Sequence, residues 1–118
     1  MFINRLYNII TNKGTHVPTN EGDKGMEFKT TFRQDFSIAD RFGVEAVKDT
    51  FRRAFYEWRD NVEYVTELVI VLNWKIWEYY ETNPRLAEVY EKLWRKADEW
   101  CKDNLVGDDL RYYYEITD

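Results

Sequence analysis

The sequence predicts a mainly α protein: a single-domain bundle of three long helices preceded by a short N-terminal helix. Three observations predict this class. Apolar residues recur at spacings of three and four between Val62 and Thr82, which is the period of one helix face. The chain of 118 residues holds only 2 Pro and 5 Gly, which suits helices more than a turn-rich sandwich. Aromatic residues make up 18% and supply large side chains for one core.

The first 25 residues differ in composition from the rest. Residues 12–25 collect Gly, Pro, Asn and Thr, which is the composition of a loop. Met26 follows directly and could be an alternative start codon. We therefore expect residues 1–25 to be a mobile leader or linker and 26–118 to be the single helical domain, with the choice between Met1 and Met26 as the natural start left open.

The short helix is predicted from its end signals. Residues 27–32 alternate weakly and are compatible with a short strand. Thr31 and Ser37 each precede an amide or acidic side chain by three positions, the capping-box pattern and its looser form. A helix should therefore begin at 32 or at 37 and run to Phe42, where Gly43 can take the left-handed conformation that ends a helix.

The segment from Val44 to Asn61 is the first predicted long helix. Its apolar side chains fall on one stripe: Val44, Val47, Phe51, Ala54, Phe55 and Trp58. Charged residues fill the other side at spacings that allow ion pairs along the helix. The break before the next helix is short, so the two helices should be antiparallel neighbours.

The stretch Val62–Thr82 is predicted to be the central helix. Its main stripe holds Val62, Val65, Val69, Leu72, Ile76 and Tyr79. Ile70, Val71 and Trp74 fall among the polar residues of the other side, and a helix apolar over much of its girth is usually surrounded by other elements. The uninterrupted apolar run covers only residues 68–72, whereas a membrane span needs about 20 residues. No contact with a membrane is expected.

The last part of the chain predicts one more helix and an ambiguous tail. Asn83 followed by Pro84 is a common helix start, and the apolar face continues to about Leu105 before Gly107 as a stop signal. The tail has three tyrosines and an Ile–Thr pair, which favours a strand over residues 110–116 by composition. Such a strand would pair with 27–32 or with the leader; the alternative is a tail laid over the bundle by its aromatics.

Composition and charge restrict the partners and the compartment. The net charge of −5, from 17 basic and 22 acidic residues, makes nucleic acid an unlikely partner. Residues 26–61 hold seven basic and seven acidic side chains, which predicts a salt-bridged surface. The single cysteine, Cys101, allows no intramolecular disulfide, and the N-terminus has no secretory h-region. A reducing, cytoplasmic setting is the default.

The sequence contains no catalytic, metal-binding or cofactor-binding pattern. His16 is the only histidine and lies in the leader, so no spacing suits zinc or a Cys–His pair. Cys101 sits on an apolar helix face and should be a buried structural thiol. Glu63 and Glu67 could place two carboxylates together, although a solvated acidic edge is the ordinary interpretation. We expect no cofactor, and the sequence leans against an enzyme without excluding one.

Four residues are candidates for an interaction site. Asn73 lies between Leu72 and Trp74; if buried, its amide should bond across the bundle and fix helix register, and otherwise it is exposed or contacts a ligand or partner. Trp77, Tyr80 and Trp94 belong to a surplus of aromatics over what a small core needs. Some of them should reach the surface, although aromatics at helical spacing more often pack inside.

The chain also resembles a family. The pieces that carry the resemblance are Asp35-Phe36, Ile38-Ala39-Asp40, Phe42-Gly43, Asp49-Thr50 and Asn73-Trp74-Lys75. In these pieces the chain, over roughly residues 28–118, resembles short uncharacterised proteins of conjugative elements and prophages of Gram-positive gut bacteria. The resemblance implies a mobile-element setting and carries over no activity and no site.

Three functions remain compatible with the sequence. The first is a non-enzymatic accessory or interaction protein that binds a protein partner or itself as a homodimer. The second is a small-ligand-binding protein or enzyme with a polar pocket near Asn73. The third is a nucleic-acid-binding regulator that uses the helix over residues 44–61.

Overall fold

The computed structural model describes residues 28–117, and this part of the chain is all α. Its five helices are α2 (Phe32–Asp40), α3 (Val44–Trp58), α4 (Val62–Tyr79), α5 (Pro84–Asn104) and α6 (Gly107–Thr117). The predicted helical class is confirmed. None of these helices is long and apolar enough to cross a membrane. The predicted leader, residues 1–25, lies outside the described residues.

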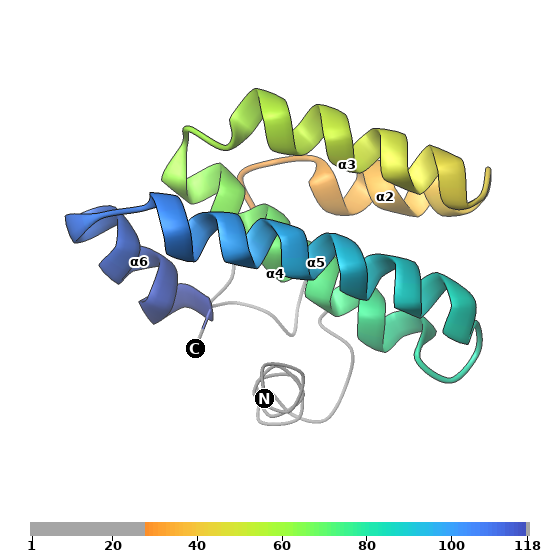
Figure 1. The fold of residues 1–118 in the computed structure, drawn as a ribbon. Helices are drawn as coiled ribbons and strands as arrows, with labels where there is room; N and C mark the ends of the chain where they lie inside the picture. Colours follow the sequence, from red (N-terminus) through yellow and green to blue (C-terminus); the bar gives the residue numbers. More distant parts are fainter. Residues whose placement is uncertain (1–27, 118) are drawn as a thin grey trace.

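The helices form two layers with a fifth element at one end (Figure 1). Helices α2 and α3 lie side by side above α4 and α5, and α6 turns back beneath the end of α5 (Figure 1). The short connections between α2 and α3, between α3 and α4, and between α4 and α5 make each pair antiparallel neighbours. As a result α4 contacts every other described helix.

Short-range signals set the helix boundaries. Gly43 has a φ of +109°, which side chains rarely adopt, and its carbonyl accepts the first α3 bond from the Val47 N–H at 3.1 Å. Helix α4 begins after Asn61, whose side chain accepts from the Tyr64 N–H at 3.1 Å. Helix α5 begins at Pro84 after a capping Asn83, as the sequence predicts.

Helix α4 is the centre of the core. Every residue from Val65 to Ile76 is buried, polar residues included. The largest fully buried side chains around it are aromatic or branched: Tyr90, Tyr113, Phe36, Phe51, Phe55, Leu68 and Leu72. The mixed apolar pattern of this stretch is therefore the signature of a helix surrounded on all sides.

The C-terminal segment is a helix, so the predicted strand over 110–116 is wrong. Asp108 and Asp109 lie in the first turn of α6, where negatively charged carboxylates interact favourably with the helix dipole. Tyr113 and Thr117 are one turn apart and both buried, and the Tyr113 hydroxyl donates to Asp98 on α5. Burial of this helical face outweighs the strand preference of tyrosine and isoleucine. The predicted arrangement of three long helices and one short helix is thus incomplete.

The partner strand predicted over 27–32 is also wrong within the described residues. Phe32 begins α2, which is the earlier of the two predicted starts. The residues before it are held by a side chain instead of a sheet, because the Lys29 and Thr30 N–H groups donate to the Glu67 carboxylate at 2.8 and 2.9 Å. No strand occurs in the part of the chain that the structure describes.

The central position of α4 leads to a stability prediction. Leu72→Ala should lower the free energy of unfolding by about 2–5 kcal/mol, because a fully buried side chain is truncated in a packed core. Glu88→Ala, at an exposed position of α5, should change it by less than about 0.5 kcal/mol. Chemical denaturation measures both, and equal costs would contradict the central placement of α4.

Candidate functional site

A groove runs between α2 and α3 and has a volume of about 590 Å³. It is lined by Thr31, Phe32, Asp35, Ile38, Ala39 and Phe42 from α2 and its cap, and by Ala46, Asp49, Thr50, Arg53, Ala54, Glu57 and Trp58 from α3. We call this feature the α2–α3 groove. Its lining extends over the whole of α2, about 13 Å, and over about 18 Å of α3, at 1.5 Å per residue.

The rims of the groove are regular helical stripes. On α2 the residues at 31, 35, 38 and 42 lie on one face, and on α3 those at 46, 49, 53 and 57 do. Ile38 and Phe42 on the first stripe are 49% and 78% exposed, and Trp58 at the far end is 38% exposed. Three large apolar side chains of one groove are therefore open to solvent, and none is needed to fill the core.

Small side chains form the floor of the groove. Ala39, Thr50 and Ala54 are buried beneath the rims, and Phe32 closes the end near Trp58. Trp58 is supported from behind by Tyr64, with ring centroids 4.8 Å apart. Small residues between two helices leave room for another chain to approach closely, so the hollow follows directly from the sequence of the two faces.

The charged groups that line the groove are mostly acidic. The lining holds the carboxylates of Asp35, Asp49 and Glu57 and one guanidinium, that of Arg53. Asp49 also pairs with Arg52 on the outer side of α3, and Asp35 accepts from the Thr31 hydroxyl at 3.0 Å. The groove is therefore an apolar channel with a negative balance along its edges.

Two polar contacts fix α2 against α4 and so hold one wall of the groove. At its N-terminal end, the buried Glu67 carboxylate accepts from two N–H groups and from the Thr30 hydroxyl. At the other end, Asp40 is surrounded by side chains of α4 and α5. A buried carboxylate that accepts several hydrogen bonds has its hydrogen-bonding capacity satisfied. Both carboxylates can therefore be buried without an unpaired acceptor.

The second contact is a cluster of Ser37, Asp40, Lys75, Tyr79 and Tyr90, here called the Asp40 cluster, in which Lys75 and Tyr90 are buried, Tyr79 is half-buried and Ser37 is exposed. The Lys75 amine lies 2.9 Å from the Asp40 carboxylate, and the two side chains are 3% and 6% exposed. The Tyr79 hydroxyl donates to the same carboxylate at 2.6 Å, and the Tyr90 hydroxyl donates to its other oxygen. Three helices thus meet at one carboxylate.

The Asp40 cluster contains a serine beside a lysine, as some catalytic sites do, but its hydrogen bonds indicate a structural role. Lys75 lies 2.9 Å from the Ser37 hydroxyl, which is the pairing of a serine nucleophile with a lysine base. An ammonium group has three N–H donors and no lone pair. Ser37, Asp40 and Glu78 supply three acceptors around this amine, so no lone pair is directed to the serine.

The two tyrosines of the Asp40 cluster are held in the neutral form. Burial raises the pKa of the Tyr90 hydroxyl well above its usual range, and the hydrogen bond to Asp40 raises it further. The same two causes raise the pKa of Tyr79. Both hydroxyls therefore act as donors to the carboxylate at neutral pH, not as bases.

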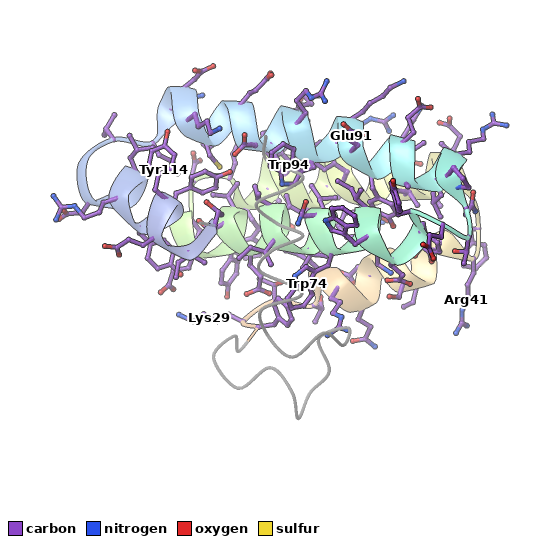
Figure 2. The ribbon with its side chains drawn as sticks, turned by 90° about the horizontal axis from the view of Figure 1, so that it is seen from below. Lys29, Arg41, Trp74, Glu91, Trp94 and Tyr114 are labelled. Carbon is purple, nitrogen blue, oxygen red and sulfur yellow. The ribbon has the colours of Figure 1, made fainter. Side chains whose placement is uncertain are left out.

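The four predicted interaction residues differ in how far they are buried. Trp77 and Tyr80 lie together at the end of α4, with ring centroids 5.3 Å apart, and Tyr80 is 59% exposed. Trp94 is buried, and Figure 2 shows it directed from α5 toward α4. Asn73 is fully buried on α4. An interaction role for these residues stays a prediction, with Trp77 and Tyr80 as the members nearest the surface.

Asn73 does not make the cross-bundle hydrogen bond that the sequence predicts for a buried amide. Within the described part of the chain, neither its oxygen nor its nitrogen has a hydrogen-bond partner, and the same holds for the buried Thr66 hydroxyl two turns earlier. The pocket predicted near Asn73 and the α2–α3 groove are different places, since Asn73 does not line the groove.

Two basic residues of α3, and Arg59 just after it, contact nearby side chains. Lys48 and Arg52 pair with acidic side chains three residues before them. The Arg59 guanidinium lies 4.9 Å from the ring centroid of Tyr56 and 5.6 Å from that of Trp100. This agrees with the salt-bridged surface that the even charge balance predicts.

Sequence reasoning missed the groove and the Asp40 cluster. From the sequence, Ile38 and Phe42 are assigned to a short helix and not to a surface, although an apolar pair one turn apart beside a second apolar stripe can mark two faces. Lys75 between Trp74 and Ile76 is a charge within an apolar run and predicts a buried partner. Nothing in a single sequence identifies Asp40 as that partner, because 35 positions separate them.

The thiol and the carboxylates indicate no further chemistry. Burial and the nearby Asp98 raise the pKa of Cys101 to about 12, so the thiol stays protonated and unreactive. Among residues 28–117, no three His, Cys, Asp or Glu side chains gather closely enough to hold a metal ion.

Comparison of the chain with models of protein families, with curated proteins and with solved structures finds no match. The functional proposal therefore rests on the described residues.

The raised tyrosine pKa predicts alkaline instability. The folded protein keeps the Tyr90 proton above pH 10, where an unfolded tyrosine loses it, so unfolding releases a proton there. The contribution of Tyr90 to the free energy of unfolding is thus fully present below about pH 10. Above that pH it falls by up to about 1.4 kcal/mol per pH unit. Urea denaturation from pH 8 to about 11.5, a range that spans the ordinary tyrosine pKa of about 10, should show a shallower fall in the free energy of unfolding for Tyr90→Phe. The exposed Tyr80, changed to Phe, is the control; equal slopes for all three proteins would contradict the prediction.

The orphaned amide of Asn73 gives a second prediction for this region. Asn73→Leu, close in volume, should raise the free energy of unfolding by up to about 1–3 kcal/mol, since a buried polar group without a partner is removed. Thermal and chemical denaturation measure the change. A loss of more than about 1 kcal/mol would mean that the amide makes a favourable contact in solution.

Proposed function

We propose that this protein is a non-enzymatic interaction module that binds an apolar segment of a partner protein in the α2–α3 groove. The observation that supports the proposal is the exposure of Ile38, Phe42 and Trp58 along one hollow between two helices. Exposed apolar residues that gather around a concave surface mark binding sites, and tryptophan is enriched among the residues that dominate binding energy.

The shape of the groove favours a chain segment over a small molecule. Its volume of about 590 Å³ falls within the range of small-ligand pockets. Such pockets enclose most of their ligand, however, whereas Phe42 at the rim of this groove is 78% exposed. An open channel between two helices suits a peptide or helix that itself buries the rims.

The setting that we propose is the one implied by the family resemblance: an accessory protein of a conjugative element or prophage, acting in the cytoplasm. The single cysteine, which is buried and protonated, is compatible with a reducing compartment.

A homodimer is the second candidate, through Trp77 and Tyr80. These rings contact one another at the end of α4, and Tyr80 is exposed. Neither residue lines the α2–α3 groove, so substitutions in the groove distinguish the two candidates.

Selection of displayed random peptides on the immobilised protein tests the proposal. Phe42→Asp should weaken the selected peptides at least about tenfold, because it places a charge on the apolar rim. Its exposure means that the fold should tolerate the change, which circular dichroism checks. Tyr114→Asp, at another exposed aromatic on α6, is the matched control and should bind normally. Peptides that bind both variants equally well, or a selection that yields no binder, would contradict the proposed site.

A further inference from the structure

The charged residues of the α2–α3 groove restrict what can occupy it. We infer that the groove receives a basic amphipathic helix of a partner protein, about three turns long; this inference rests on the proposed function and specifies its ligand. The observations that carry it are the length of the groove, its small-residue floor and the excess of carboxylates along its edges.

The dimensions favour a helix as the occupant. The α3 wall of the groove runs from residue 46 to residue 58, about 18 Å or three helical turns, and the opposite wall is α2 together with its cap and the turn that follows it. Ala39, Thr50 and Ala54 on the floor have small side chains, which leave space between the rims. A third helix can therefore lie against the first two with its apolar stripe inward. The side chains of that stripe would contact Ile38 and Phe42 on one rim and Trp58 at the end.

The charges along the groove favour a partner helix of positive charge. Three carboxylates line the two walls, Asp35 on α2 and Asp49 and Glu57 on α3, and the lining holds one guanidinium, that of Arg53. Asp49 is paired with Arg52, so the excess negative charge along the edges comes from Asp35 and Glu57. A helix seated between these walls presents the residues that flank its apolar stripe to both of them. Lysine or arginine at these flanking positions would meet opposite charge, whereas glutamate would meet like charge at short range.

A second copy of this chain is a poorer occupant than a foreign basic helix. In the described part of the chain, α6 has exposed Tyr114 and Ile116, which could supply an apolar stripe. Its first turn carries Asp108 and Asp109, so it would bring more negative charge to an acidic groove. Helix α5 carries exposed basic residues, but it contributes none of the large apolar side chains that are exposed.

Two synthetic helical peptides of about 14 residues test the inference, since that length covers the groove at 1.5 Å per residue. Both carry the same leucine stripe; one has lysine at every flanking position and the other has glutamate. Fluorescence anisotropy of the labelled peptides measures their affinity for the full chain. We expect the lysine peptide to bind at least about tenfold more tightly, and its affinity to fall as salt rises.

Matched variants locate the binding. The double variant Asp35→Asn, Glu57→Gln should reduce the affinity of the lysine peptide at least about threefold and flatten its salt dependence. Glu88→Gln with Glu99→Gln removes the same charge from the exposed face of α5 and should leave both properties unchanged. Phe42→Asp should weaken the peptide through its apolar contacts.

The outcomes separate this inference from the proposed function. Equal affinity for the two peptides, with both lost in Phe42→Asp, would overturn the basic helix and leave the groove as a binding site. If none of the groove variants changes the affinity of the lysine peptide, the peptide binds elsewhere on the protein and the inference is overturned. Absence of binding by either peptide would also overturn it, and the display selection would then decide the proposed function independently. Sedimentation of the free protein as a dimer that Phe42→Asp dissociates would identify a second copy as the occupant.

Discussion

The contact between Lys75 and Asp40 is the interaction on which the arrangement of these helices depends most. Both side chains are almost completely buried, one on the central α4 and the other at the end of α2. Burial of an unpaired charge costs several kcal/mol, and loss of one partner of a buried pair typically costs about 3–5 kcal/mol. Any other register of α2 on α4 would separate Asp40 from Lys75 and leave the ammonium with only the half-exposed Glu78 of its own helix, so the pair favours one register. Tyr90 extends the same selection to α5.

The groove is a consequence of this arrangement. Helix α2 is tied to α4 at both ends, by Glu67 before its first turn and by Asp40 at its last residue. The inner face of α2 packs into the core with Phe36 fully buried, while Ile38, and Phe42 just after the helix, are exposed and line the groove. A wall fixed by buried polar contacts loses little freedom when a ligand binds, and such preorganisation favours affinity. Under the proposed function, the same contacts would serve stability on one side of α2 and recognition on the other.

The fold could be predicted from the sequence where the signal is local. The spacing of apolar residues in α4, the Asn83–Pro84 start and the turn at Gly43 each depend on a few neighbouring residues. The tail was predicted wrongly because its tyrosines favour a strand in isolation, whereas the contact of Tyr113 with Asp98 exists only after α5 and α6 pack. Local propensity cannot include that contact.

The candidate site was less predictable than the fold for a related reason. A single sequence shows that Lys75 lies in an apolar run, but its partner is distant in the chain and any acidic residue could fill the role. Aromatics pose the same difficulty, because Trp94 and Trp58 both lie on apolar stripes and only packing decides that one is buried and the other lines a groove. Surplus aromatic content predicts a binding surface and not its position.

The two surfaces that could bind a partner differ in how much contact they can supply. Trp77 and Tyr80 form one pair at a helix end, and a stable interface buries about 800 Å² on each partner. Residues that dominate binding are usually surrounded by contacts that exclude water. The α2–α3 groove provides such surroundings, since Ile38, Phe42 and Trp58 border a common floor and carboxylates flank them. An occupant would shield these apolar side chains while its own charges stay at the wet edges, which is the arrangement that gives affinity from the centre and selectivity from the rim.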